Sequence, residues 1–171
     1  MKEKLEQFFR ENFEDAVIRT DYFRDQLSFY LRPEYLFEVC QALMADNDLE
    51  VKMLSDICSL DWLGDPEEAD GRFEVIYNLY SLKHSYRFFI KIRLSDDKPE
   101  VDSLTSLWHT ADWLEREIYD LMGIKFIGHP DLRRILTADD VDGYPLRKDF
   151  PLTYEKPRFS YNKDGPPEVI T

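Results

Sequence analysis

Charged side chains gather in one stretch of the chain, residues 108–136, around a short amphipathic segment. When residues 108–122 are placed on a helical wheel, the leucine, isoleucine and methionine side chains form one apolar arc. Glu115 falls inside or at the edge of that arc, and Glu117 borders its other edge. A carboxylate beside apolar surface can have its pKa moved toward neutrality, which suits general acid–base catalysis. Glu115 and Glu117 are therefore the first candidates for chemistry.

The same two carboxylates could instead be paired with basic groups. Burial of an unpaired charge costs several kcal/mol, so partners are expected, either Arg133 or Arg134 or a basic group of another protein. On the opposite side of the wheel, Asp112, Arg116 and Asp120 lie at i, i+4 spacing, where such pairs support a helix. Ionic pairing, within the chain or at an interface, is the interpretation that we favour.

Few other residues offer catalytic chemistry. The chain has no Gly-x-Ser-x-Gly motif and no Cys/His pair, so a hydrolase is not predicted. The enzymatic alternative is an independent soluble acid–base enzyme that uses Glu115 and His129, which would need a polar pocket around both. Cys40 and Cys58 are the only cysteines and are predicted to be buried free thiols, so no Zn or Fe–S site is expected. The acidic loop 64–71 lacks the alternating ligands of a Ca²⁺ loop and is predicted to be solvated.

The pattern of apolar residues predicts the elements that must position these side chains. Helical spacing predicts helices over 2–14, from Pro33 to about 45 and over 108–122, the last ended by Gly123. Alternation predicts strands over 16–20, 26–31, 51–60, 72–81 and 86–94, the last two as a hairpin. This order predicts an α+β fold: a two-layer α/β sandwich with a mixed sheet of about five strands and its helices on one face. The domain is expected to span 1–137.

Residues 138–171 are predicted to be an extended tail that binds a partner. The tail holds five of the nine prolines, which prevent helix and internal strand, together with five aromatic residues. Rings at intervals along an extended segment favour a strap across another protein's surface, and the alternative is a tail folded back on this chain's own sheet. Its proposed contacts are Arg147, Lys148, Phe150 and Tyr154.

The totals exclude several classes of function. A formal charge of −13 opposes binding to nucleic acid, because phosphate contacts need a basic face. No signal or transit peptide and no apolar run of about 20 residues are evident, so membrane association is expected only through a partner.

A longer match then narrows the function. The order and spacing of a known signature are matched by Glu115-Arg116-Glu117, Asp120-Leu121-Met122, His129, Arg133 and Ile135-Leu136. Two surrounding segments agree with it: Gly128-His129-Pro130-Asp131-Leu132-Arg133-Arg134 and Gly143-x-Pro145-Leu146-Arg147-Lys148-Asp149-Phe150-Pro151. The chain resembles, over about residues 1–155, the C (30-kDa) subunit family of respiratory complex I, the proton-translocating NADH:quinone oxidoreductase.

The resemblance implies a peripheral-arm subunit without cofactors that scaffolds the quinone-reducing module. FMN, Fe–S clusters and quinone would belong to partner subunits, and the isolated chain would have no activity. The implied partners are the large hydrogenase-like subunit, the Fe–S subunit and neighbouring peripheral-arm subunits. The implied location is the cytoplasmic face of the bacterial inner membrane. A similar signature in membrane-bound hydrogenases and formate hydrogenlyases makes the equivalent scaffold subunit there the main alternative.

The residues that we expect to form the partner interface or its ionic network belong to the signature and the tail. They are Glu115, Arg116, Glu117, Asp120, His129, Asp131, Arg133, Arg134, Arg147, Lys148, Phe150 and Tyr154.

Overall fold

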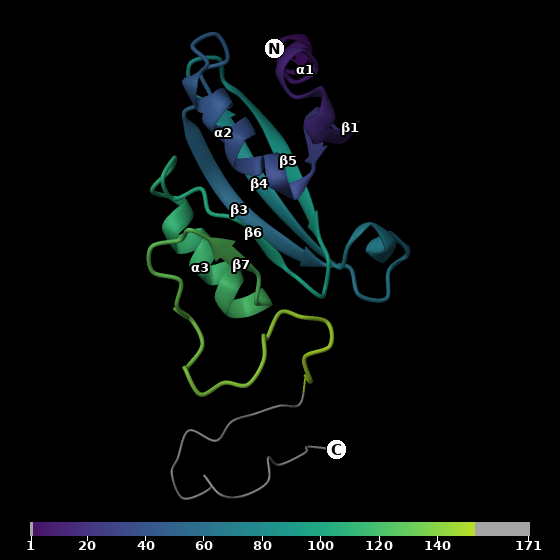
Figure 1. Ribbon diagram of the computed structural model, residues 1–171, viewed down its shortest axis with the longest axis vertical. Coiled ribbons are helices and arrows are strands. Elements are labelled where there is room, and N and C mark those ends of the chain that lie inside the picture. Colours follow the sequence, from purple (N-terminus) through teal and green to yellow (C-terminus); the bar gives the residue numbers. More distant parts are fainter. Residues whose placement is uncertain (1, 153–171) are drawn as a thin grey trace, which may run out of the picture.

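The computed structural model describes residues 2–152 and arranges them around one five-stranded sheet (Figure 1). The strand order is β1-β2-β5-β4-β3, in which β2 and β5 run parallel and the other neighbours antiparallel. The strands are β1 (Val17–Phe23), β2 (Gln26–Leu31), β3 (Met53–Asp61), β4 (Phe73–Ser81) and β5 (Tyr86–Leu94). The helices are α1 (Lys2–Asn12), α2 (Leu36–Ala45) and α3 (Ala111–Met122). Three 3-10 turns also occur: η1 (Glu14–Ala16) before β1, η2 (Pro33–Tyr35) before α2 and η3 (Pro66–Asp70) between β3 and β4. The predicted α+β fold with a mixed five-stranded sheet is confirmed.

The β4–β5 hairpin is the centre of the sheet and has the predicted alternation. Phe73, Val75, Tyr77 and Leu79 are fully buried on one face of β4, while their neighbours along the strand point to the other. β5 pairs with β4 without a break, and Ser85 in the turn takes a positive φ of 52°. Because the side-chain period of a strand is two, this register fixes which residues of every strand share a face.

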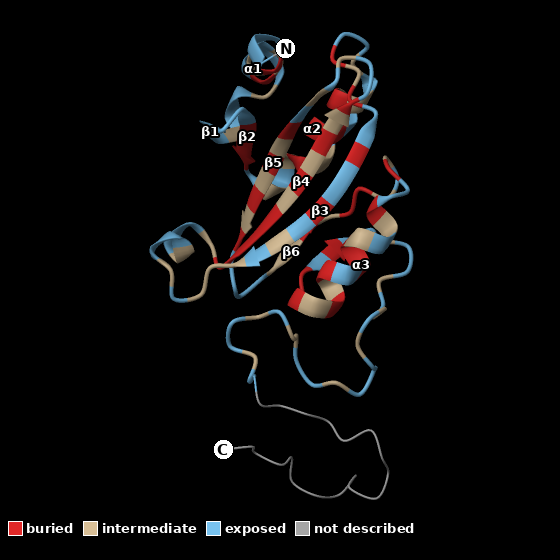
Figure 2. Ribbon diagram, turned by 180° about the vertical axis from the view of Figure 1, so that it is seen from behind, coloured by how far each residue is buried: buried red, intermediate tan, exposed pale blue. Residues whose placement is uncertain are grey.

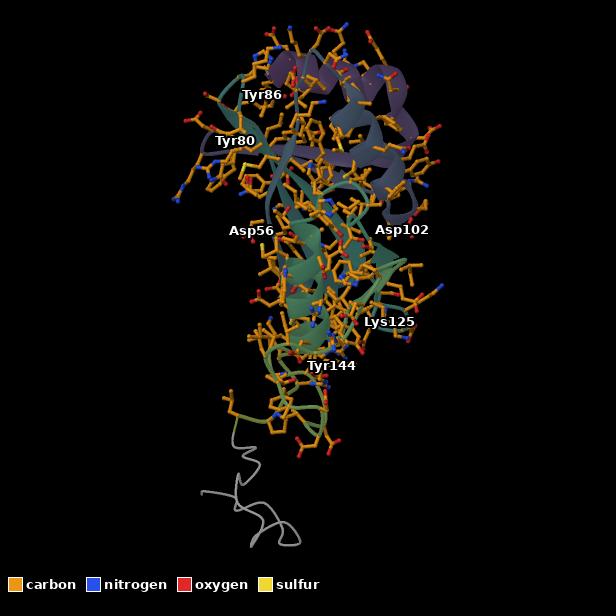
Figure 3. All side chains as sticks on the ribbon, turned by 90° about the vertical axis from the view of Figure 1, so that its left-hand side faces the viewer. Asp56, Tyr80, Tyr86, Asp102, Lys125 and Tyr144 are labelled. Carbon is orange, nitrogen blue, oxygen red and sulfur yellow. The ribbon has the colours of Figure 1, made fainter. Side chains whose placement is uncertain are left out.

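All three helices cover the face that carries Tyr77. Phe9 of α1 stacks on Phe29 of β2 with ring centroids 4.0 Å apart. The Tyr77 hydroxyl has Cys40 of α2 and Glu115 of α3 as electrostatic neighbours. From behind, no helix crosses β3, β4 and β5 (Figure 2), and the sheet seen edge-on has Asp56 and Tyr80 on the side away from α2 (Figure 3). The described helices therefore form one layer, and no helix of residues 2–152 covers the second, open face of the sheet (Figures 2 and 3).

Some predicted boundaries were wrong, and one pair of strands was missed. α1 ends at Asn12 rather than 14, the first strand runs over 17–23 rather than 16–20, and α3 begins at Ala111 rather than 108. A second, two-stranded sheet pairs β6 (Glu100–Asp102) with β7 (Lys125–Ile127) in parallel, on either side of α3 in the sequence. Strands of three residues are too short for alternation to reveal them.

Two predictions about the surface of the sheet also need correction. Cys40 is fully buried as predicted, but Cys58 is exposed, because it lies on edge strand β3 and points to the open face. The acidic loop 64–71 contains η3 and is more than a solvated loop. Its Glu67 pairs with Arg93 of β5 at 2.7 Å.

Candidate functional site

Helix α3 is held in place at both ends by contacts with distant segments. Before the helix, Trp108 Nε1 donates to the Lys52 carbonyl at 3.1 Å, and Thr110 Oγ1 donates to the Leu54 carbonyl at 3.2 Å. After the helix, Gly123 takes the left-handed conformation with φ 73°, as a C′ glycine does. A Cβ on Gly123 would lie 2.5 Å from the Tyr144 ring, so the position also admits the close approach of Tyr144 below the helix (Figure 3).

Asp120 is fully buried and anchors the segment that follows the helix. Its Oδ2 accepts hydrogen bonds from the backbone N–H groups of residues 135, 136 and 137 at 2.9, 2.6 and 2.9 Å. Its Oδ1 accepts from the Thr137 hydroxyl and from Arg134 Nη1, the latter at 3.4 Å. Burial would raise the pKa of Asp120, but the hydrogen bonds from Thr137, Leu136 and Ile135 outweigh it and hold the pKa below its usual value. Asp120 therefore stays ionised and ties the loop 134–137 to α3.

Glu115 is also fully buried, but its partners are neutral. It accepts hydrogen bonds from the Leu104 backbone N–H and the Ser103 hydroxyl, each at 2.7 Å. Burial raises the pKa of Glu115 to about 7, against the lowering effect of these two bonds. The expectation that Arg133 or Arg134 would pair with Glu115 was wrong, because the side chain points toward the β6–α3 connection instead.

Arg116 and Asp120 lie on the side of α3 opposite the apolar arc of the helical wheel, but this side is not left to solvent. Both are buried, because the segment after the helix folds back over that side. Arg116 Nε donates to the Arg133 carbonyl at 3.3 Å, and its guanidinium lies 4.9 Å from the centre of the Trp113 ring. The sequence marks both residues as polar but cannot show which later segment covers them.

His129 makes its contacts with Asp112 and Asp131. Its Nδ1 accepts from the Asp131 backbone N–H at 3.0 Å, so Nε2 carries the proton in the neutral ring. Nε2 lies 3.1 Å from the Asp112 carbonyl oxygen and 3.4 Å from the Asp112 carboxylate. Glu115 and His129 thus have separate partners, and in residues 2–152 no hydrogen bond joins them.

The basic residues of 134–148 make contacts within this chain. Arg134 Nη2 donates to the Gly143 carbonyl at 3.1 Å, and Arg147 Nε donates to the Met122 carbonyl at 2.7 Å. Lys148 reaches the sheet, where its N–H bonds to Asp61 at 2.9 Å and its Nζ bonds to the Leu63 carbonyl at 3.0 Å. The Phe150 ring would lie 3.3 Å from a Cβ on Gly143. The first part of the predicted tail therefore returns to the domain. Tyr154 and the rest of 153–171 lie outside the described residues.

The remaining predicted residues are exposed on the outer surface of α3 and its loop. Glu117 is exposed, and Arg133 pairs with Asp131 at 2.9 Å with their side chains 72% and 53% exposed. Two large apolar residues that the sequence reasoning missed lie beside them, Trp113 and Leu136, each 63% exposed. The wheel already places Trp113 off the apolar arc, and that signal could have identified it. We call Trp113, Glu117, Arg133 and Leu136 the α3 face.

The site holds parts together and shows no arrangement for a metal. Within residues 2–152, no group of three or more His, Cys, Asp or Glu side chains is placed to hold a metal ion. Among the same residues, no helix is long and apolar enough to cross a membrane. The signature residues instead divide into a buried set that fixes the loop and an exposed set on the α3 face.

The comparison with known proteins gives the family. The profile described as "Respiratory-chain NADH dehydrogenase, 30 Kd subunit" matches residues 29–156. The chain belongs to this family. It is therefore related to subunits of an oxidoreductase complex, as the signature predicted.

Relatives of this 30-kDa subunit family match over most of the chain. The C subunit of the NADH-quinone oxidoreductase of Roseiflexus sp. (strain RS-1) is 42% identical over 150 residues, covering 88% of this chain and 84% of the relative. The second C subunit of the same enzyme in Rhizobium etli (strain CIAT 652) is 46% identical over 140 residues, covering 81% and 72%.

Solved structures agree on the fold. A trypsin-resistant fragment of Nqo5 is 34% identical with a TM-score of 0.66, covering 75% of this chain and 98% of the fragment. A chain of the membrane-bound sulfane sulfur reductase, an archaeal respiratory membrane complex, has a TM-score of 0.72 at 21% identity, covering 88% and 85%. At that identity the second likeness concerns the fold alone.

Proposed function

We propose that this chain is a scaffold subunit, without a cofactor of its own, in the quinone-reducing module of an NADH:quinone oxidoreductase. It would hold the large hydrogenase-like subunit and the Fe–S subunit in the geometry that electron transfer from NADH to quinone requires. FMN, Fe–S clusters and quinone would be bound by those partners and their neighbours. As part of the complex, the chain would lie on the cytoplasmic face of the inner membrane. Other subunits would couple the electron transfer to proton translocation.

This proposal rests on the division of the signature residues into a buried set, which holds the loop, and an exposed set, the α3 face. Asp120 is buried and is used entirely on the loop 134–137 and Arg134, so it has no free oxygen for a substrate. Glu115 and His129 are likewise occupied by separate neighbours, which weighs against the soluble acid–base enzyme. The surface that α3 and the following loop present to their surroundings is the α3 face.

The composition of the α3 face suits a protein interface. Trp113 and Leu136 are large exposed apolar residues, and tryptophan is enriched among the residues that dominate binding energy. Arg116 lies against the Trp113 ring and restricts it, so less side-chain entropy remains to be lost on binding. Glu117 and the Asp131–Arg133 pair form a charged rim around these two anchors.

Copurification from the native host tests this function. The tagged full chain should bring down the large hydrogenase-like subunit and the Fe–S subunit in one complex on a native gel. Trp113→Ala should weaken that association by about tenfold or more, because a central anchor is lost. Leu82→Ala is the control, since Leu82 is 67% exposed on the β4–β5 hairpin and lies outside the α3 face.

Two results would contradict the proposal. One is that the unmodified chain copurifies with no oxidoreductase subunit. The other is that the Trp113→Ala complex assembles normally but has lost turnover, which would indicate a direct catalytic role. Copurification with hydrogenase or formate-oxidising subunits would assign the same scaffold role to the related complexes.

A further inference from the structure

No helix of residues 2–152 covers the second face of the sheet (Figure 2), which has a definite pattern of residues, although Tyr30 and Glu74 on this face are buried. The strand register aligns Cys58, Ile76, Lys91, Tyr30 and Arg19 in one row across all five strands, from β3 to β1. Neighbouring rows add apolar and aromatic residues on β3, β4 and the central strand β5, namely Met53, Leu60, Tyr80 and Phe89. We call these nine residues the open face, and Tyr80 is labelled on this side of the sheet in Figure 3.

A pocket of about 140 Å³ lies at the β1 end of this row. The β1–β2 pairing shifts register between Val17 and Arg19, and this irregularity turns Ile18 toward the pocket. The lining residues are Ile18, Arg19, Tyr30, Leu31, Asp70, Lys91 and Arg93. Three cations and one carboxylate therefore line the pocket, in a chain whose formal charge is −13.

The cations of the pocket are held in place around Tyr30. Lys91 Nζ donates to the Tyr30 hydroxyl at 3.1 Å, and the Arg19 guanidinium lies 3.8 Å from the centre of the Tyr30 ring. Arg93 is buried and already strongly paired, with Glu74 and Glu67 each at 2.7 Å. Tyr30 thus fixes both the position of the lysine and the plane of the Arg19 side chain.

Arg19 and Lys91 have weaker partners than Arg93. Arg19 lies 3.5 Å from Asp21 and 4.0 Å from Asp70, and the side chains of these two acids are 51% and 64% exposed. Lys91 lies 3.7 Å from Glu74, which Arg93 contacts more closely. An incoming carboxylate could therefore bond to Arg19 and Lys91 without breaking a short ion pair.

We propose that the open face is a second docking surface, which binds a segment of another protein subunit that places a carboxylate in the Arg19–Lys91 pocket and apolar side chains over Ile76 and Cys58. The proposal rests on the scaffold function proposed above. Neighbouring strands lie about 4.8 Å apart, so Ile76 and Arg19 are separated by about 14 Å. A short amphipathic segment with an acid at one end and apolar residues at the other spans that distance.

Charge makes a second copy of this chain a poor occupant. Two chains of charge −13 repel each other, whereas the pocket selects a local carboxylate on an otherwise apolar segment. The scaffold subunit would then contact one partner through the α3 face and another through the open face, on different sides of the fold.

Native Cys58 allows the proposal to be tested on the unmodified complex. Its thiol is exposed within the open face, whereas Cys40 is fully buried. N-ethylmaleimide should alkylate Cys58 in the purified full chain, and this reactivity should be lost in the assembled complex. Cys40 should stay unmodified in both until denaturant is added, which provides an internal control. Equal alkylation of Cys58 in the free chain and the complex would overturn the proposal.

Charge reversal tests the pocket itself. Arg19→Glu should weaken association with the partner on this face by about tenfold and restore alkylation of Cys58 in the complex. Lys83→Glu is the matched control, because Lys83 is an exposed base on the β4–β5 hairpin, paired only with Glu50 at 3.3 Å among the described residues. Normal affinity and continued protection of Cys58 in Arg19→Glu would contradict the role of the pocket. Thermal stabilisation of the free chain by inorganic phosphate, abolished in Arg19→Glu, would assign the pocket to a free anion instead.

The outcomes also separate this proposal from the scaffold function. If Trp113→Ala is lost from the complex while Cys58 stays fully reactive in the unmodified complex, the scaffold function is supported and the docking role of the open face is contradicted. Failure of the unmodified chain to enter any complex would contradict the scaffold function.

Discussion

Glu115 and Asp120 are two fully buried carboxylates on one helix with opposite electrostatic behaviour. Asp120 accepts five hydrogen bonds, including one from a guanidinium, so its negative charge is favoured despite burial. Glu115 accepts two hydrogen bonds from neutral donors, and these do not offset the loss of water. Together with how deeply each carboxylate lies inside the protein, the number and charge of its donors decide which group stays ionised.

This difference predicts how stability depends on pH. The pKa of Glu115 is about 7 in the folded chain, against an ordinary value of 4.5, so between these values the folded state retains a proton that the unfolded state loses. The free energy of unfolding should therefore fall as pH rises from about 4.5 to about 7, by roughly 3 kcal/mol in all, and then level off. The lowered pKa of Asp120 acts in the opposite sense, since its contribution is lost only as pH falls below 3.8.

Urea unfolding of Glu115→Gln across this pH range measures the effect. The neutral amide cannot ionise, so the fall attributable to Glu115 should disappear in the variant. Glu117→Gln makes the same chemical change at an exposed position of α3 and should keep the slope of the unmodified chain. A slope in Glu115→Gln equal to that of the unmodified chain would show that Glu115 is ionised when folded.

Single residues were predictable from the sequence only as far as α3 itself determines them. The helical wheel identifies Glu115 as a carboxylate on the apolar side, and the structure buries it completely. The wheel places Asp120 on a polar side, which is correct for an isolated helix. Its burial comes from residues 134–137, which lie beyond the helix and whose path no local pattern specifies.

At the scale of elements, Gly123 joins the end of α3 to the loop that carries Tyr144. Gly123→Ala should destabilise the protein for two reasons: an L-residue in the left-handed conformation costs about 1–2 kcal/mol, and the new Cβ would meet the Tyr144 ring at 2.5 Å. We expect a loss of about 2–4 kcal/mol in urea unfolding and faster proteolysis of residues 138–150.

Gly128→Ala separates the two causes. Gly128 has a similar φ of 83°, but a Cβ there would meet nothing within 4 Å. It should therefore cost only the backbone term of about 1–2 kcal/mol and leave proteolysis of 138–150 unchanged. Equal effects of the two variants would show that the Tyr144 contact contributes nothing.

The predictability of the elements follows their length and exposure. β4 and β5 each have nine residues with one face in the core, so alternation in the sequence locates them well. β6 and β7 have three residues each and exist because α3 brings them together in parallel. Such long-range pairing has no local signal, so these two strands could not be predicted.

At the scale of the whole molecule, Arg72 connects three distant parts of the chain. It bonds to Asp61 at 3.0 Å, Asp96 at 3.0 Å and Asp149 at 2.9 Å, and its side chain is only 6% exposed. Arg72→Ala should lower the free energy of unfolding by about 3–5 kcal/mol, because it leaves three carboxylates close together without their cation. Urea unfolding measures this, and proteolysis should show that residues 143–150 have come loose from the sheet.

Arg133→Ala is the comparison for this prediction. Arg133 pairs with Asp131 at 2.9 Å, a similar distance, but both side chains are largely exposed. Such a pair contributes about 0–1 kcal/mol, so this variant should unfold almost as the unmodified chain does. If Arg72→Ala lowers the free energy of unfolding no more than Arg133→Ala does, then residues 143–150 do not depend on the ion pairs of Arg72 for their position.

The bonds of Asp120 have a consequence for sequence variation. Because its Oδ2 contacts backbone N–H groups at 135, 136 and 137, it recognises the path of the main chain there, and the side chains at 135 and 136 are left free of that task. Those two positions can exchange one side chain for another to suit a different neighbour while the loop keeps its course. Proline is the exception, because it lacks the hydrogen that Asp120 binds. The loop 134–137 thus combines a fixed backbone with side chains that can vary.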